Sequence, residues 1–348
     1  MKIGVVMGTR PEIAKNYSIV KALREKEVDF FVLHTNQHSD VRMQESIFLE
    51  LGYQADFIMR GEYCLGKAID WVRDKISNLG LDMIIVNGDT AAALIGTIAG
   101  MYSDVQVAHV EAGLRSFDHL MYEERNRIMV DTVAQLLFAY TQQQAAYLAS
   151  QKEIRGDIYS VGNTTVDLIN DFQNRFNKMT PSKYAFVTLH RKEFTDRKDL
   201  MIKVFHALNS IAYHFDNVYL PLHPRTKDAI QNYGLTEDLF SNLIISEPLP
   251  VLESLSYIRN ASLVLTDSGC VQEEAYIFKV PCLTLRQNTE REQTLFDDAN
   301  IVTGFSPSSI AEAAVYQLNR EEIEYTDVYG PPGAGRRIVD IICSRAST

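Results

Sequence analysis

The 348-residue sequence is short of several features that would place it in a class at once. Its four cysteines are scattered without a CxxC pair, so we expect reduced thiols and no zinc site. No apolar stretch approaches the roughly 20 residues that span a bilayer, and the apolar run at 3–7 is too short for a signal peptide. These absences lead us to expect a cytoplasmic protein without a membrane partner.

Positive charge is also scarce, because 34 Lys and Arg residues stand against 45 Asp and Glu residues, a formal net charge of −11. A nucleic-acid partner is not expected, since phosphate neutralisation needs a basic face. An acidic protein that binds an anion must hold it with local donors and not with its overall field. The sequence has neither a cluster of metal ligands nor a GxGxxG fingerprint, so we expect no metal and no nicotinamide cofactor.

What the sequence does contain is a regular alternation of short apolar runs with longer amphipathic stretches. Runs that are apolar throughout, separated by helices, predict parallel sheets covered on both faces. The predicted strands form two series, at 3–7, 30–35, 83–88, 105–110, 136–141 and 158–163, and at 185–190, 218–223, 243–246, 263–267, 282–286 and 301–305. A polar connector at 171–183 separates the two series. We therefore predict an α/β protein with two doubly wound, Rossmann-like domains, at 1–170 and 171–335.

Polar residues occur at the ends of these strands, where ligands of doubly wound sheets bind. They are Arg10 and Lys15 after the first strand, Asp89 after 83–88, Glu111 after 105–110, His190 ending 185–190 and His223 ending 218–223. Each has an ordinary alternative. Asp89 could cap a helix, Glu111 could pair with Arg115 and Glu123 with Arg127 on a surface, and the histidines could be packed in the core. Their shared placement favours a binding site.

The stretch "LVLTDSGCVQEEA" at 263–275 predicts a buried strand, a small-residue turn and a helix start. Gly269 lets backbone approach a ligand, and Ser268 with the N–H groups of 269–270 forms an anion site at a helix N-terminus. Glu274 lies one turn after Cys270 on the same helix face and could accept hydrogen bonds from a ribose diol. The alternative is that Asp267 or Ser268 only caps the helix and both glutamates only complement its dipole.

Several motifs together resemble one family. "GTRPEIAK", "NGDTAAAL", "HVEAGLRSFDHLMYEERNR", "LHRKE", "TDSGCVQEEA" and "LRQNTER" occur in the order and spacing of the non-hydrolysing UDP-N-acetylglucosamine 2-epimerases. The resemblance covers nearly the whole chain. It implies the GT-B fold, in which two Rossmann-like domains face a cleft, with the last helix (about 336–348) packed back on the N-terminal domain. It also implies no cofactor, and we expect a homodimer.

The resemblance assigns a role to each candidate residue. Asp89, Glu111 and Glu123 would be the acid/base groups, and His190 would lie near the phosphates. The substrate-binding residues would be Arg10 and Lys15 (diphosphate and sugar), Leu249 and Ser254 (uracil), Ser268, Gly269 and Cys270 (phosphate), Glu274 (ribose), Arg291 (nucleotide) and, without a specified contact, His223. The sequence departs from the family where Tyr122 replaces a Pro and Cys270 the second Gly of "DSGG". The segment "GEYCLGK" lacks the Gln of an activator site, so the resemblance does not extend to allosteric activation by UDP-GlcNAc.

The activity that the resemblance implies is interconversion of UDP-GlcNAc and UDP-ManNAc, which supplies an activated sugar for cell-surface polysaccharide. The C2 proton of an N-acetyl sugar is poorly acidic, so the family's route is loss of UDP from C1 with removal of the C2 proton, a glycal intermediate and re-addition of UDP. The alternatives are a hydrolysing 2-epimerase, a 2-epimerase for a modified UDP-HexNAc, a GT-B glycosyltransferase and a nucleotide-sugar-binding protein without turnover. A transferase needs typically one base in the N-terminal half, so the carboxylates there disfavour it.

Overall fold

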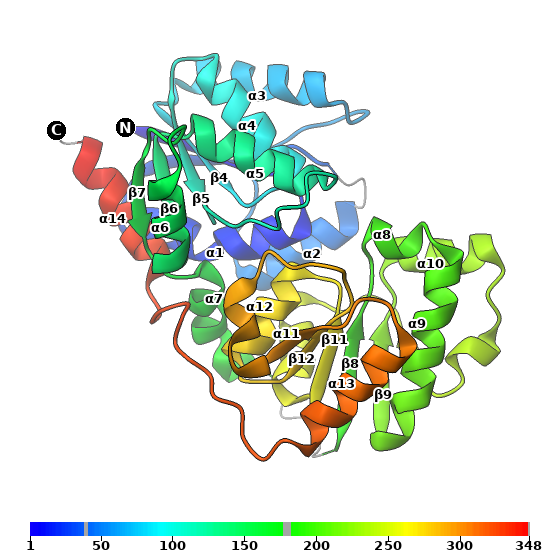
Figure 1. Ribbon diagram of the computed structural model, residues 1–348. Coiled ribbons are helices and arrows are strands. Elements are labelled where there is room, and N and C mark those ends of the chain that lie inside the picture. The colour runs from blue at the N-terminus through cyan, green and yellow to red at the C-terminus, as the bar shows by residue number, and fades with distance from the viewer. Residues whose placement is uncertain (38–40, 177–181, 347–348) are drawn as a thin grey trace. The chain divides into compact units, whose positions relative to one another are not determined.

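The structure of the chain, a computed structural model, describes residues 1–37, 41–176 and 182–346. Its contacts divide the chain into two compact units. Unit 1 comprises Met1–Gln173 and Asp327–Thr348, and unit 2 comprises Asn174–Thr326. Each unit is built around its own parallel sheet with helices on both faces (Figure 1). The predicted fold class, an α/β protein with two doubly wound sheets, is therefore confirmed.

Unit 1 contains a seven-stranded parallel sheet in the order β3-β2-β1-β4-β5-β6-β7. Its strands are β1 (Lys2–Met7), β2 (Asp29–His34), β3 (Phe57–Ile58), β4 (Met83–Asn87), β5 (Gln106–Val110), β6 (Leu136–Ala139) and β7 (Asp157–Ser160). Both faces of the central strands are buried, as a parallel sheet requires. The run 83–88, for example, is apolar because alternate residues of β4 face opposite helix layers. Among the strands of the described residues, β3 alone was not predicted, since a two-residue strand has no periodicity to detect.

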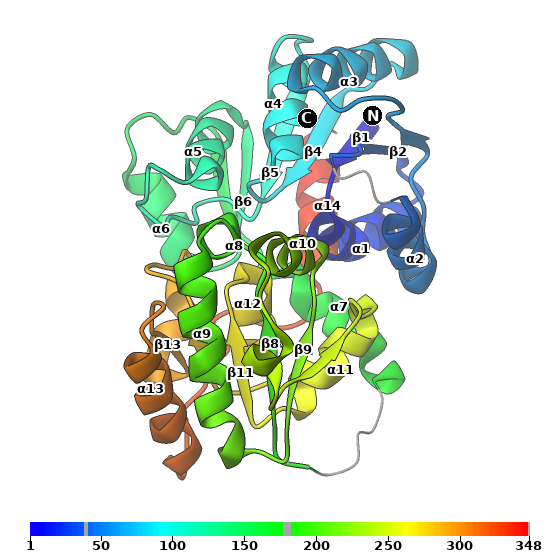
Figure 2. The ribbon, with the colours of Figure 1, turned by 90° about the vertical axis from the view of Figure 1, so that its right-hand side faces the viewer.

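The α-helices that cover this sheet in the described residues of unit 1 are α1 (Arg10–Glu25), α2 (Val41–Leu51), α3 (Leu65–Leu79), α4 (Ala91–Met101), α5 (Tyr122–Val133), α6 (Gln142–Ser150), α7 (Thr164–Phe172) and α14 (Ala334–Ala346). Helices α3 and α4 contribute to one buried cluster with Val6, Val86 and Val107 of the strands. Helices α1, α7 and α14 pack against one another on the other side of the sheet (Figure 2). Among the described residues, none of the helices is both long and apolar enough to cross a membrane.

The C-terminal helix α14 is anchored to unit 1 by a buried carboxylate on α7. Asp167 accepts hydrogen bonds from the backbone N–H groups of Gly333, Ala334 and Gly335, the last at 2.8 Å. These are N–H groups that a helix start leaves without intrahelical partners. A Cβ at Gly335 would lie 2.5 Å from the backbone of Ser18, so only glycine permits this approach of α14 to α1.

Unit 2 contains a six-stranded parallel sheet in the order β10-β9-β8-β11-β12-β13. Its strands are β8 (Tyr184–Thr188), β9 (Asn217–Pro221), β10 (Ile244–Ser246), β11 (Leu263–Thr266), β12 (Cys282–Thr284) and β13 (Asn300–Val302). Its helices are α8 (Lys192–Thr195), α9 (Lys198–Ile211), α10 (Pro224–Tyr233), α11 (Val251–Asn260), α12 (Gly269–Ile277) and α13 (Pro307–Asn319), with 3-10 turns η1 (Gln173–Arg175, partly in unit 1), η2 (Ala212–His214), η3 (Glu237–Phe240) and η4 (Glu292–Asp298).

Alternate residues of the unit 2 strands point into two different cores. Val187 and Leu265 face the cluster formed with α9 and α13, which lie side by side in Figure 2. Phe186 and Val264 face the cluster formed with α11 and α12. Because both faces are covered, the period-2 pattern disappears and the strands read as continuous apolar runs.

Candidate active site

The topology marks one position at the edge of each sheet where a ligand is expected. In unit 1 the strand order reverses between β1 and β4, and in unit 2 between β8 and β11. Ligands of doubly wound sheets bind beyond the carboxyl ends of the strands at such switch points. The structure places Arg10, Lys15, Asp89 and Glu111 after β1, β4 and β5, and His190 after β8. The strand-end residues of each unit thus lie at the edge where its own switch point is found.

The turn after β1 is tied to the turn after β4 by Glu12. Its Oε2 accepts hydrogen bonds from the N–H groups of Gly8 (2.9 Å) and Thr9 (2.8 Å) and from the Thr9 hydroxyl, and its Oε1 accepts one from the Thr90 hydroxyl at 2.7 Å. Burial raises the pKa of Glu12 to about 7, although these hydrogen bonds work in the opposite direction. We did not single out Glu12 from the sequence. Its signal is the capping box, Thr9 followed three residues later by Glu12.

Glu111 forms a buried ion pair with Lys15, which reaches it from the second turn of α1. The Tyr140 hydroxyl donates a further hydrogen bond to Glu111 Oε2 at 3.2 Å and also contacts Thr164. The ammonium group favours the ionised form of this carboxyl, the form that accepts a proton. Surface pairing of Glu111 with Arg115 is not what the structure shows, because Arg115 contacts Asp131 at 2.7 Å.

Asp89 is held by a cation as well, in this case Arg127 of α5. The guanidinium also contacts Glu124 at 2.8 Å, so it bridges two carboxylates. The helix-capping alternative for Asp89 is not supported, because Thr90 is the N-cap of α4 and accepts the N–H group of Ala92 at 3.1 Å. Asp89 is thus a strand-end carboxylate whose side chain points to a guanidinium and not to the helix start.

The helix start around Glu123 separates two neighbouring acids. Glu124 is buried and accepts hydrogen bonds from the N–H groups of Ser116 (2.8 Å) and Phe117 (3.2 Å), which fixes the loop after β5. Glu123 is half-buried in the first turn of α5. Arg127, the expected surface partner of Glu123, contacts Glu124 and Asp89. Glu124 therefore has the structural role, and Glu123 is the more accessible of the two carboxylates.

Two strands of unit 2 are followed by histidines, and a buried carboxylate holds the backbone at one of them. Asp267, at the end of β11, accepts the backbone N–H groups of His190 and Arg191, both at 2.8 Å, and lies 3.3 Å from His190 Nδ1. The His190 and His223 rings lie 5.1 Å apart. His223 accepts the N–H group of Arg225 at 3.2 Å as the N-cap of α10. Both histidines thus flank the switch point, and His190 keeps a third of its side chain exposed.

Helix α12 begins at this switch point, as the sequence predicts. Ser268 is its N-cap residue, yet within the described part of the chain its side chain makes no capping hydrogen bond. Gly269 and Cys270 form the first turn, whose N–H groups have no intrahelical acceptor. Glu274 is half-buried one turn later, whereas Glu273 is buried. The capping-only interpretation of Ser268 is therefore not favoured, since the hydroxyl does not cap.

Arg291 lies behind this helix start. The side chain is almost fully buried, and its Nε lies 2.9 Å from Glu273 Oε1 of α12. Its neighbour Glu290 pairs with Arg286 at 2.8 Å and packs against Gly269, where an added Cβ would lie 2.5 Å from Glu290 Oε1. In this geometry Arg291 holds α12 in place and adds positive charge near its N-terminus.

Leu249 and Ser254 belong to the segment around the start of α11. Leu249 is half-buried and packs against the α11–α12 cluster. Ser254 is half-buried in the first turn, where its N–H group donates to the carbonyl of Pro250 at 2.9 Å. Neither side chain carries a charge, so any nucleobase contact here would involve backbone and apolar surface.

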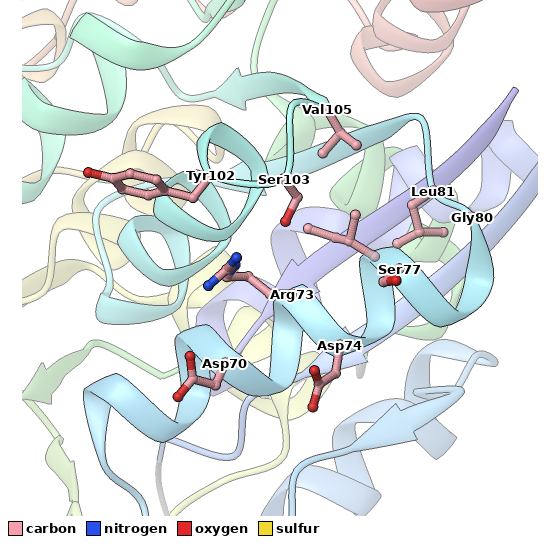
Figure 3. Close-up of a pocket in the computed structure, with 10 residues that line it drawn as sticks. Asp70, Arg73, Asp74, Ser77, Gly80, Leu81, Tyr102, Ser103 and Val105 are labelled. Atoms are coloured by element: carbon pink, nitrogen blue, oxygen red, sulfur yellow. The ribbon is translucent and has the colours of Figure 1, made fainter.

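A separate hollow of about 580 Å³ lies elsewhere on unit 1 (Figure 3). Asp70, Arg73 and Asp74 of α3 line it together with the turn after α4, and Arg73 points toward that turn (Figure 3). Leu81 and Val105, which precede β4 and β5, place it at the amino ends of the strands. It therefore lies at the opposite edge of the sheet from Asp89 and Glu111. Across the described residues, no group of three or more His, Cys, Asp or Glu side chains is arranged to hold a metal ion.

The two switch points offer different chemistry. Unit 1 gathers carboxylates that a nearby cation holds in place, which suits proton transfer to and from a bound molecule. Unit 2 offers helix N–H groups, histidines and arginines, which suit a phosphate or diphosphate.

Comparison with known proteins identifies the family of the chain. The family model described as UDP-N-acetylglucosamine 2-epimerase matches residues 21–343. A UDP-N-acetylglucosamine 2-epimerase of Methanococcus maripaludis is 36% identical, over 98% of each chain. The UDP-2,3-diacetamido-2,3-dideoxy-D-glucuronate 2-epimerase of Pseudomonas aeruginosa is 33% identical, over 98% of this chain and 99% of that one.

Solved structures are similar as well. The crystal structure of the Methanocaldococcus jannaschii UDP-GlcNAc 2-epimerase in complex with UDP-GlcNAc and UDP aligns with a TM-score of 0.88 at 35% identity, over 99% of this chain and all of that one. The Staphylococcus aureus MnaA–UDP structure aligns with a TM-score of 0.89 at 29% identity, over 99% and 97%. On this evidence the chain belongs to the UDP-N-acetylglucosamine 2-epimerase family.

Proposed function

We propose that this protein interconverts UDP-N-acetylglucosamine and UDP-N-acetylmannosamine by inversion at C2. The observation that carries the proposal is the pair of carboxylates after the adjacent strands β4 and β5, Asp89 held by Arg127 and Glu111 held by Lys15. Inversion requires a base that removes the C2 proton from one face and an acid that returns a proton to the other. Relatives named UDP-N-acetylglucosamine 2-epimerase support this choice of substrate.

The reaction proceeds by elimination and re-addition. A carboxylate takes the C2 proton, the C1–O bond breaks, UDP leaves as an anion, and a C1–C2 double bond forms the glycal. UDP then adds back to C1 while C2 receives a proton from the opposite face. Asp89, Glu111 and Glu123 supply the base and the acid, and Lys15 adds positive charge beside Glu111. The cation–carboxylate pairs keep each group fixed before the substrate arrives.

Unit 2 binds the UDP moiety in this proposal. The N–H groups of Gly269 and Cys270 at the start of α12 face the phosphates, with His190 as an additional donor. Glu274 accepts hydrogen bonds from the ribose hydroxyls. Arg291 acts through Glu273 on the position of α12.

Turnover in D2O tests the mechanism. Because the C2 proton leaves to a protein carboxylate and a different group returns one, product UDP-N-acetylmannosamine formed in D2O is expected to carry deuterium at C2 in NMR spectra. Traces of free UDP and of the glycal are expected over many turnovers. Product that keeps hydrogen at C2, with no release of UDP, contradicts elimination. Free N-acetylmannosamine as the main product indicates a hydrolysing enzyme, and transfer to an acceptor indicates a glycosyltransferase.

A second candidate substrate is a 3-substituted, oxidised UDP-HexNAc. The observation in its favour is the 33% identity to the Pseudomonas aeruginosa enzyme named for UDP-2,3-diacetamido-2,3-dideoxy-D-glucuronate. Comparison of kcat/KM for this sugar and for UDP-N-acetylglucosamine decides between them, because the preferred substrate has the larger value.

We also propose that the enzyme acts as a cytoplasmic homodimer that supplies N-acetylmannosamine-type sugar for cell-surface polysaccharide. The division of labour, with acid/base groups in unit 1 and the nucleotide in unit 2, follows the domains expected at 1–170 and 171–335. Sedimentation equilibrium at micromolar concentration tests the dimer, and loss of N-acetylmannosamine from surface polysaccharide in a deletion strain tests the pathway.

A further inference from the structure

A histidine and an aspartate lie fully buried behind the two turns of unit 1 that carry the candidate acid/base residues Asp89 and Glu111. His109 is the fourth residue of β5 and Asp131 is on the last turns of α5, and both are inaccessible to solvent. The elimination mechanism gives no role to either side chain. Buried ionisable groups are expensive to retain unless they are paired, so their contacts indicate what they do.

Each ring nitrogen of His109 contacts an oxygen that belongs to a different element. Nδ1 lies 2.7 Å from Asp131 Oδ1, and Nε2 lies 2.9 Å from the backbone carbonyl oxygen of Gly88. A carbonyl oxygen only accepts hydrogen bonds, so Nε2 must carry a proton. An ionised carboxylate also only accepts, so Nδ1 must carry one as well. His109 therefore joins α5 to the residue that directly precedes Asp89.

Asp131 also contacts the turn after β5, which carries Glu111. Its Oδ2 lies 2.7 Å from an Arg115 guanidinium nitrogen and accepts the backbone N–H group of Gly113 at 3.2 Å. Burial alone would raise the pKa of Asp131, but the charges and hydrogen bonds of His109 and Arg115 outweigh it, so the pKa is lowered and the carboxyl is ionised. One carboxylate thus holds β5 through His109 and the turn after Glu111 through Gly113.

The turns themselves need such support. Glu111 has a φ of 70°, in the left-handed region that non-glycine residues rarely adopt, and Gly88 and Gly113 also have positive φ values, of 77° and 86°. Strained backbone of this kind persists only where surrounding contacts determine it. The two turns also touch, because a Cβ added at Gly88 would lie 3.7 Å from Glu111 Oε1.

We propose that His109 and Asp131 are positioning residues that set the separation of the Asp89 and Glu111 carboxylates. This inference rests on the proposed function, in which those carboxylates act on opposite faces of the sugar. His109 acts on Asp89 through the Gly88 carbonyl, and Asp131 acts on Glu111 through Gly113. Displacement of a reacting group by about 1 Å lowers turnover on the order of a hundredfold, so the pair affects kcat without touching the substrate.

Two substitutions separate the two contacts of His109. The side-chain nitrogen of Asn occupies the place of Nδ1, so His109→Asn keeps the bond to Asp131 and loses the bond to Gly88. The side-chain nitrogen of Gln occupies the place of Nε2, so His109→Gln keeps the bond to Gly88 and loses the bond to Asp131. We expect each variant to lower kcat about tenfold to a hundredfold, with KM and UDP affinity within about threefold of wild type.

Double-mutant cycles then show which turn each contact controls. His109→Asn combined with Asp89→Asn should reduce kcat by less than the product of the single effects, whereas His109→Asn combined with Glu111→Gln should give the full product. His109→Gln should show the reverse pattern. If the single effects on kcat multiply fully in all four double variants, the proposal is overturned, because His109 then acts on neither carboxylate.

A matched control separates positioning from stability. His34 is another fully buried histidine at the end of a strand of the same sheet, where its Nδ1 accepts the N–H group of Asn36 at 3.1 Å. His34→Asn should lower the thermal midpoint about as much as His109→Asn and leave kcat within about twofold of wild type. A fall in kcat that follows the thermal midpoint in all these variants contradicts a positioning role.

Nitrogen-15 NMR of the histidine rings tests the arrangement without any substrate. In the wild-type protein, both ring nitrogens of His109 are expected to donate hydrogen bonds, and Asp131→Asn is expected to shift the Nδ1 resonance. A His109 ring with one proton in the wild-type protein overturns the proposal by itself. Absence of turnover with every UDP-sugar tried would instead overturn the proposed function.

Discussion

Both units have a doubly wound sheet. However, the side chains that hold the candidate site residues at the two switch points carry charges of opposite sign. In unit 1 the candidate reactive groups are carboxylates, and cations hold them: Lys15 contacts Glu111, and Arg127 contacts Asp89. The carboxylates come from the strand ends, and the cations come from helices that pack beside them.

In unit 2 the arrangement is reversed. The buried carboxylate Asp267 holds the N–H groups of His190 and Arg191, and Glu273 holds Arg291. Here the supporting groups are carboxylates, and the supported groups are N–H donors and a cation. The comparison teaches that the fold supplies only the position of a site. The sign of the charge that supports the strand ends decides whether that position moves protons or binds an anion.

Neutralising a candidate reactive carboxylate of unit 1 tests the difference between the two units most directly. Glu111→Gln and Asp89→Asn keep the side-chain size but cannot take up a proton, so each should lower kcat about a hundredfold to ten-thousandfold. UDP affinity, measured by calorimetry, should stay near wild type because the donors of unit 2 are unchanged. Asp70→Asn, on exposed α3, is the control and should leave kcat unchanged. Near-normal turnover in either active-site variant removes that residue from the acid/base set.

Glu12 gives the second largest effect, a dependence of stability on pH. Its pKa is about 7 in the folded protein against an ordinary value of 4.5, so between these values the folded state keeps a proton that the unfolded state has lost. Stability from this group is complete below pH 4.5 and falls as pH rises to about 7, by on the order of 3 kcal/mol.

Glu12→Gln measures that effect, because Gln resembles the neutral carboxyl and does not titrate. Urea unfolding at pH 5, 6 and 7 should show the free energy of unfolding of wild type falling relative to the variant. Parallel curves for the two proteins would mean that Glu12 is already ionised at pH 5, in which case its three donors at Gly8 and Thr9 outweigh burial.

The sequence predicted the fold because its signals are local. Each of the twelve predicted strand runs overlaps an observed strand, since apolar runs of four to six residues between helices are readable without tertiary information. The strand-end rule likewise identified Asp89 and Glu111 as candidates. Among the described strands, the two-residue β3 was not predicted, because it is too short to show a hydrophobic pattern.

The partners of the candidate residues were not predictable in the same way. Glu111 and Lys15 contact each other although they are 96 residues apart in the sequence, whereas the nearby candidate Arg115 contacts Asp131. Burial of Arg291 behind α12 also depends on tertiary packing, which the motif alone does not report. Local pairing rules thus gave the wrong partner at Glu111 because strand ends in a parallel sheet bring distant segments together.

A third experiment tests the anion-binding side of the comparison. Ser268→Ala with Glu274→Ala removes one hydroxyl and one carboxylate near the start of α12, and we expect UDP affinity to fall about tenfold. The fold should be kept, because the Ser268 side chain makes no capping hydrogen bond within the described residues. Calorimetry with UDP measures the affinity, and unchanged binding would leave these residues with a structural role only.

The smallest expected effect comes from Cys270, the residue that replaces a family glycine. If the first turn of α12 binds phosphate through backbone N–H groups, Cys270→Ala leaves the donor in place, and UDP affinity should change less than about threefold. Gly269→Ala is the matched contrast one residue earlier, because its new Cβ would lie 2.5 Å from Glu290 Oε1 and force either the buried Glu290 side chain or the helix start to move. We expect that variant to bind UDP several-fold more weakly than Cys270→Ala. Equal loss in both variants would point to direct contact of UDP with the thiol, and no loss in either would place the phosphates away from this turn.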